Sequence, residues 1–150
     1  MCPGEDTDYG NLVACHPKEG HCAFGVQAKG SWPSPEDNSF FLSPLRPDIE
    51  ERFRFRRNGT IEAANEGDLA AEQTIRRLKL DGAELVGWRR EFLAGAIPKE
   101  PRERARLLRQ LEASESKLNA REDVMLREYS FALRQILTRE VQKDQYRPRS

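Results

Sequence analysis

Apolar positions recur every three or four residues through the second half of the chain, a spacing that is typical of helices burying one face. Over residues 68–95 the gaps are four, three and seven, and Asp68 is suited to cap the start of a helix. Because Gly82 interrupts this stripe, the segment is predicted to form one kinked helix or two short ones, ending near Gly95 and Pro98. The stripe consists of Ala71, Ile75, Leu78, Leu85, Phe92 and Ala96.

A longer apolar stripe begins after Pro101, a residue suited to the first turn of a helix. No proline or glycine occurs between Arg102 and Arg147, so one long helix is predicted over about 101–145, roughly 65 Å in length. Folding the chain back at Pro98 would place the two helical segments side by side. The predicted fold is therefore mainly α, with an antiparallel helical hairpin that ends in a long helix. The stripe consists of Leu107, Leu108, Leu111, Leu118, Met125, Leu126, Tyr129, Leu133, Ile136 and Leu137.

Two glutamates, Glu115 and Glu122, interrupt the long stripe at heptad spacing. A coiled-coil seam rarely holds two carboxylates without partners, so both are expected to form ion pairs inside the helical hairpin. The expected partners come from the first helical segment: Arg76, Arg77 and Lys79.

The two predicted helices differ in length, because the first reaches only to about residue 129 of the second. The apolar residues beyond that point form an overhang, and Phe131 lies on the opposite side of the same helix. An uncovered apolar surface is typical of an interface with a second copy or another protein. The alternative is that Phe53 and Phe55 of this chain cover it. The overhang consists of Leu133, Ile136, Leu137 and Val141.

Strict alternation of polar and apolar residues over 51–57 predicts a β-strand, and Asn58-Gly59 is typical of a two-residue type I′ turn. Residues 60–63 would return as the second strand. This β-hairpin would carry Phe53 and Phe55 on one face. Arginines 52, 54 and 56 would lie on the other.

The first 47 residues contain six of the nine prolines and are predicted to form an extended arm, separate from a domain over 48–150. Large apolar side chains punctuate this arm, most notably Trp32, Phe40 and Phe41. Two interpretations follow: these side chains pack on the helices of this chain, or the arm lies along the surface of a partner.

Composition narrows the possible classes of protein. Basic and acidic residues number 25 each, and no apolar run approaches the ~20 residues of a membrane span. The first residues lack a signal-peptide pattern, so an intracellular, cytoplasmic protein is expected. Residues 1–45 carry six acidic and two basic side chains, whereas residues 98–150 carry thirteen basic and nine acidic ones. The zero net charge argues against a generic polyanion binder and leaves local patches open.

Every cysteine and histidine falls within the first 22 residues. Thiolates and imidazoles are the usual zinc ligands, but no Cys-x2-Cys pair is present, so free thiols in a reducing compartment are expected and no metal or other cofactor is assigned. A zinc site and a disulfide or redox role are the alternatives. Since no Gly-x-Ser-x-Gly and no Walker loop occur, the chain is not expected to be an enzyme. The cluster consists of Cys2, Cys15, His16, His21 and Cys22.

The expected function is that of a structural or adaptor protein in a larger assembly, of the filament- or microtubule-associated or virion type. Its partners would be other proteins or copies of itself, bound through the arm and the long helix. The alternative is a nucleic-acid-binding protein, because arginines beside aromatic residues are typical of phosphate and base contacts. The arginines concerned are Arg52, Arg54, Arg56 and Arg57.

Overall fold

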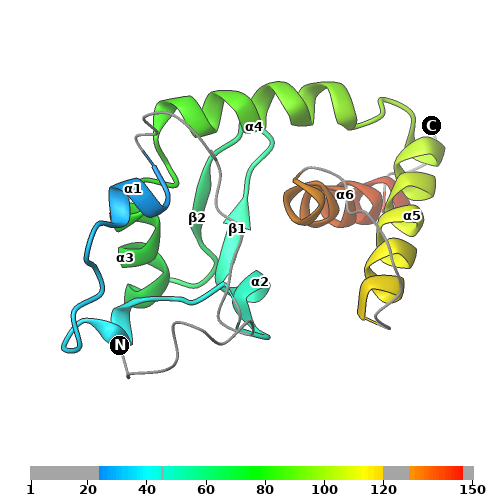
Figure 1. Ribbon diagram of the computed structural model, residues 1–150. Helices are drawn as coiled ribbons and strands as arrows, with labels where there is room; N and C mark the ends of the chain where they lie inside the picture. Colours follow the sequence, from blue (N-terminus) through cyan, green and yellow to red (C-terminus); the bar gives the residue numbers. More distant parts are fainter. Residues whose placement is uncertain (1–23, 45, 120–128, 147–150) are drawn as a thin grey trace. The chain divides into compact units, whose positions relative to one another are not determined.

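The computed structural model describes residues 24–44, 46–119 and 129–146. Within these ranges the protein is mainly α-helical and contains one two-stranded antiparallel sheet, as predicted (Figure 1). The elements are α1 (Val26–Lys29), the 3-10 helix η3 (Asn38–Phe40), α2 (Ile49–Arg52), β1 (Phe53–Phe55), β2 (Ile61–Ala63), α3 (Leu69–Arg77), α4 (Ala83–Ala96), α5 (Pro101–Asn119) and α6 (Ser130–Gln145).

The chain divides into two compact units. Unit 1 comprises Met1–Phe53 and Ile61–Leu85, and unit 2 comprises Arg54–Thr60 and Val86–Ser150. The predicted boundary at residue 47 therefore does not coincide with this division, which passes through the β-hairpin and the first turn of α4.

The β-hairpin is confirmed, but its turn is one residue longer than predicted. The N–H of Arg56 donates to the carbonyl of Thr60 (2.9 Å), and the N–H of Gly59 donates to the carbonyl of Arg56 (3.0 Å). Only Gly59 has a positive φ, +88°, whereas a type I′ turn needs two such residues. The connection is therefore a three-residue turn. The Asn58 side chain accepts hydrogen bonds from the N–H and the hydroxyl of Thr60, and these two bonds stabilise the turn.

The segment 68–95 forms two helices, α3 and α4, one of the two predicted arrangements. The carboxylate of Asp68 caps α3 by accepting a hydrogen bond from the N–H of Ala71 (3.1 Å). After α3, Lys79 adopts a positive φ of 51°, which turns the chain before α4 begins.

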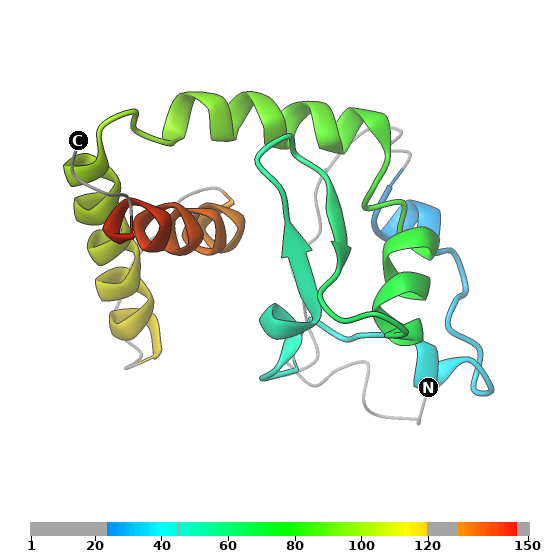
Figure 2. The ribbon, with the colours of Figure 1, turned by 180° about the vertical axis from the view of Figure 1, so that it is seen from behind.

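The prediction of one long helix over 101–145 is wrong. The helix that starts at Pro101 is described as far as Asn119, and a separate helix, α6, begins at Ser130 after Tyr129, whose φ of 48° is incompatible with a continuous helix. The helices α5 and α6 pack against each other, as two opposite views show (Figures 1 and 2). Packing two short helices together buries apolar side chains that a single straight helix would leave uncovered.

In unit 1, α3 packs against β2 and η3. Thr74, in α3, is only 2% exposed and links this helix to the segment before α2. Its hydroxyl accepts a hydrogen bond from the N–H of Leu42 (2.9 Å) and donates to the carbonyl of Phe40 (3.4 Å). The apolar side chains buried in unit 1 are Phe24, Trp32, Leu42, Phe53, Ile61, Ala71 and Ile75.

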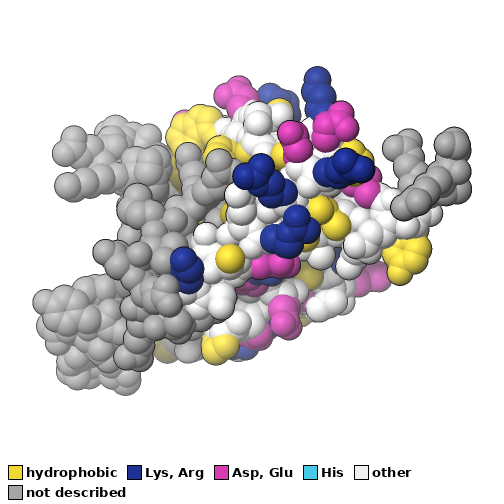
Figure 3. Space-filling model, turned by 90° about the vertical axis from the view of Figure 1, so that its right-hand side faces the viewer, with side chains coloured by type: hydrophobic (Ala, Val, Ile, Leu, Met, Phe, Trp, Pro, Cys, Tyr) yellow, Lys and Arg dark blue, Asp and Glu magenta, His cyan; other side chains and the backbone are white. Residues whose placement is uncertain are grey.

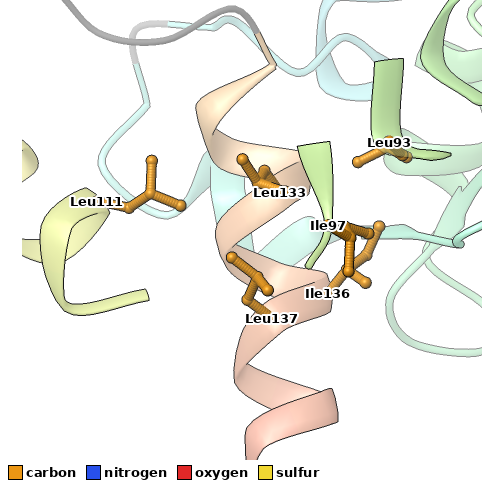
Figure 4. Close-up of a cluster of buried hydrophobic side chains, with 6 residues drawn as sticks. All are labelled: Leu93, Ile97, Leu111, Leu133, Ile136 and Leu137. Carbon is orange, nitrogen blue, oxygen red and sulfur yellow. The ribbon is translucent and has the colours of Figure 1, made fainter. Parts of the chain in front are cut away.

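The core of unit 2 joins α4, α5, α6 and the loop after α4 (Figure 4). Phe55 packs against this core from β1, and its ring meets that of Phe131 edge-on at 5.3 Å. The six buried core residues are Leu93, Ile97, Leu111, Leu133, Ile136 and Leu137.

Polar side chains of α6 complete the attachment of β1. The N–H of Phe55 donates to the side chain of Gln135 (3.0 Å), and the carbonyl of Phe55 accepts a hydrogen bond from Arg139. Both main-chain groups of Phe55 are thus bound by side chains of a helix.

Ion pairs between described side chains connect α5 to α6. Arg104, 8% exposed, binds the carboxylate of Asp144 at 2.6 Å and also donates to the carbonyl of Pro98. Glu115 binds Arg134 at 2.8 Å. The expected partnership of Glu115 with residues 76–79 is therefore replaced by one with α6, and Glu122 lies outside the described residues.

Candidate functional site

The aromatic residues expected in a partner-binding arm divide into two groups. Trp32 is buried (8% exposed), and its ring meets that of the half-buried Phe41 edge-on at 5.3 Å. Phe40, by contrast, is 38% exposed. The packing of Trp32 within unit 1 supports the first interpretation for that residue, and Phe40 is the aromatic side chain of the three that stays available to a partner.

The apolar overhang predicted at the end of the long helix is absent as an exposed surface. Leu133 and Leu137 are fully buried and Ile136 is 3% exposed, all three in the core of unit 2. Phe131 and Val141 are half-buried. The alternative interpretation holds for Phe55, which packs on this cluster, but not for Phe53, which is buried in unit 1. Because the helix is broken before Ser130, Leu133, Ile136 and Leu137 face α4 and α5.

The arginines of the hairpin region are largely engaged within the chain. Arg52 forms a bidentate pair with Asp68, at 2.5 and 2.6 Å, and Arg57 lies 3.8 Å from the carboxylate of Glu140. Arg54 and Arg56 have exposed side chains, and each also takes part in an interaction within the chain. Pairing with carboxylates lowers the positive potential that this surface offers to phosphates.

The Arg52–Asp68 pair also fixes the entrance to α3. The hydrogen bond from Arg52 holds the pKa of Asp68 below its ordinary value of 3.8, against the opposing effect of partial burial. The same hydrogen bond raises the pKa of Arg52. One carboxylate thus caps α3 and anchors α2.

Acid is expected to destabilise unit 1 through Asp68. Because the folded-state pKa lies below 3.8, the stabilisation is complete above that pH and is lost as the pH falls toward the folded-state value. Asp68→Asn keeps a capping side chain but loses the ion pair, at a cost of about 2 kcal/mol at pH 7. Hydrogen exchange of α3 between pH 6 and pH 3 should show a smaller loss of protection in the variant than in the wild type. Equal losses would contradict the assignment.

The proposed cysteine and histidine cluster lies outside the described residues: Cys2, Cys15, His16, His21 and Cys22. Within the described ranges, no group of three or more His, Cys, Asp or Glu side chains is placed to hold a metal ion.

A shallow groove of about 520 Å³ lies at the start of α3, in unit 1. Two exposed apolar side chains line it: Phe40 from η3 and Leu69, which is 56% exposed, from α3. The paired Arg52 and Asp68 are also part of its wall, so the groove combines apolar contact area with charged groups. The full lining consists of Ser39, Phe40, Arg52, Asn65, Glu66, Gly67, Asp68, Leu69 and Ala70.

Charge separates between the two units. Among the described residues, unit 1 holds 11 acidic and 6 basic side chains, a net charge of −5, whereas unit 2 holds 14 basic and 7 acidic ones, a net charge of +7. Counted over their full sequences, unit 1 has 15 acidic and 7 basic residues and unit 2 has 18 basic and 10 acidic ones, so the zero net charge of the chain is the sum of −8 and +8, a sharper separation than the gradient along the sequence.

Five of the 14 basic side chains described in unit 2 lie on α5, and four of them are exposed: Arg102, Arg106, Arg109 and Lys117. Figure 3 shows several Lys and Arg side chains (dark blue) on this side of the molecule, with Asp and Glu side chains (magenta) among them. Sequence reasoning missed this surface, because it followed the apolar positions of the same helix. The signal was the spacing of four, three and eight residues, which places all four side chains on one side.

No protein-family model, curated protein or solved structure matches this chain in comparisons with known proteins. The site is therefore interpreted from its own geometry. In the described part of the chain, no helix combines the length and apolar character needed to cross a membrane.

Proposed function

We propose that this chain is a non-enzymatic adaptor or structural component of a larger assembly, of the filament- or microtubule-associated or virion type. The observation that carries the proposal is the groove in unit 1, whose lining includes two exposed large apolar side chains, Phe40 and Leu69. Exposed apolar groups gathered in a concave surface favour protein recognition.

The groove favours a partner segment that combines an apolar side chain with basic residues. Phe40 and Leu69 offer the apolar contact, and Glu66 adds a carboxylate to the lining. The net charge of −5 over the described residues of unit 1 attracts a basic segment and speeds its encounter. We therefore narrow the predicted interface from the whole arm to this groove.

Replacing both apolar residues, Phe40→Ala with Leu69→Ala, is expected to weaken partner binding at least tenfold, since buried aromatic and aliphatic anchors contribute about 1–2 kcal/mol each or more. Partners would first be recovered from native cells with the wild-type chain and identified by mass spectrometry. Binding of each purified partner would then be measured by calorimetry for the wild type and the variant.

Trp88 supplies the matched control, because its exposure of 40% is close to that of Phe40 and it does not line the groove. Trp88→Ala should leave binding unchanged. The proposed groove would be wrong if the double variant bound every purified partner as tightly as the wild type, or if Trp88→Ala had the larger effect.

A further inference from the structure

We infer that the exposed face of α5 is a phosphate-contacting surface that binds nucleic acid along its backbone. This inference does not rest on the proposed function, since it concerns unit 2 alone and is tested with a different ligand. The surface, called here the α5 basic face, consists of Arg102, Arg106, Arg109 and Lys117.

The α5 basic face lies opposite the buried side of the helix. Leu111, 4% exposed, is nine residues after Arg102, which is two and a half turns and therefore places it on the other side. From Arg102 to Lys117 the face extends over 15 residues, about 22 Å. Its cations follow one another along the helix axis, with the exposed Ala113 filling the gap before Lys117.

In the part of the chain that the structure describes, no hydrogen bond or ion pair joins the side chains of these four cations to another residue. This distinguishes them from Arg104 and Arg134, on α5 and α6, which bind Asp144 and Glu115. The acidic residues of α5 nearest to the face are Glu103 and Glu112. By helical geometry they project about 80–100° from the middle of the face, one on each side, so they lie at its edges and not between its cations.

The chemistry of the face favours nucleic acid over a protein partner. Three of the four cations are arginines, which bind phosphate oxygens in bidentate geometry. The side chains along the face are cationic or small, whereas protein interfaces are centred on aromatic and large apolar groups. The absence of such groups from the face also disfavours insertion into a lipid surface. Contacts of this kind position a protein on a phosphate backbone without reading base sequence.

The test is the salt dependence of binding to a fluorescent 20-base-pair DNA duplex, measured by anisotropy with the full chain. Four phosphate contacts predict a slope of log K against log salt of about −3.6, so affinity should fall about 150-fold between 50 and 200 mM salt. In Arg106→Gln with Arg109→Gln, two contacts remain, and the slope should be about −1.8, with a fall of about 12-fold. Arg106→Lys with Arg109→Lys keeps the charge and should keep the wild-type slope.

The control with equal charge loss is Arg76→Gln with Arg77→Gln on α3, where both residues are exposed and belong to unit 1. It should keep the wild-type slope. Circular dichroism of every variant should be unchanged, since none of these side chains is buried.

Four results would overturn the inference. The first is no binding to the duplex at 50 mM salt. The second is an unchanged slope in Arg106→Gln with Arg109→Gln, and the third is loss of binding in Arg54→Gln with Arg56→Gln instead, which would assign the contact to the β-hairpin. The fourth is equal or tighter binding to polyglutamate or to phosphatidylserine vesicles at the same salt, which would assign the face to an acidic protein or a lipid surface.

Discussion

Leu133→Asp is expected to unfold unit 2. The side chain is fully buried among Leu93, Leu111 and Leu137, so even truncation to alanine would cost about 2–5 kcal/mol. A carboxylate adds the cost of burying a charge without a partner, and the sum exceeds about 5 kcal/mol, comparable to the whole stability of many small domains. Hydrogen exchange measured by mass spectrometry should show loss of protection throughout α5 and α6.

The matched control is Leu69→Asp, which introduces the same residue at a leucine that is 56% exposed. Its effect on stability should be within about 0.5 kcal/mol, because no core contact is lost and an acidic residue at a helix N-terminus is favourable. Retention of wild-type protection in α5 and α6 by Leu133→Asp would show that these helices are not held by the core described here.

Gly59→Ala is expected to destabilise unit 2 by about 3 kcal/mol or more. A methyl group at this position would stand 2.8 Å from the N of Arg90 and even closer to the carbonyl oxygen of Val86, both main-chain atoms of α4. Backbone cannot give way as a flexible side chain can, so either the turn or α4 must shift, at about 1–3 kcal/mol. The φ of +88° adds roughly 1–2 kcal/mol for any residue with a Cβ.

Gly67→Ala separates these two effects. Gly67 has a similar φ of +76°, but a methyl group there would meet no atom within 4 Å. Only the conformational cost of about 1–2 kcal/mol is therefore expected. Urea titrations of both variants measure the difference. Equal losses of stability would show that the approach of the turn to α4 contributes nothing.

The elements with local signals were predictable from the sequence. The alternation over 53–55, the capping carboxylate of Asp68 and the proline at the start of α5 each act within a few residues, and each element forms where its signal lies. The length of the turn after β1 was not predictable in the same way. It depends on which turn residues adopt a positive φ, and only Gly59 does so, although Asn58 tolerates one as well.

The break before α6 was not predictable, because no proline or glycine marks it and Tyr129 carries the left-handed conformation instead. What favours the break is the burial of Leu133 and Leu137 against Leu111, a contact between residues more than twenty positions apart. The conformational propensity of neighbouring residues contains no information about stabilisation by such a distant contact. The division of the hairpin between two units has the same origin, since it depends on what each strand packs against.

The candidate surfaces differ in how far the sequence indicated them. Phe40 was expected as a contact residue, but Leu69, which lines the same groove, lies outside the apolar stripe predicted for residues 68–95 and was assigned no role. The arginines of α5 have a clear helical spacing, yet only the structure separates Arg106, which is exposed, from the buried Arg104 two residues earlier. From the sequence alone, an arginine that forms a buried ion pair cannot be distinguished from one whose side chain is exposed to solvent.

The binding of both main-chain groups of Phe55 by Gln135 and Arg139 has a consequence for how this protein can assemble. An exposed strand edge is a template for β-augmentation, in which a strand of another chain pairs with it and can seed aggregation. At Phe55 the donor and the acceptor that such a strand would need are already occupied. Recognition at this edge must therefore proceed through side chains, or else begin with the release of α6.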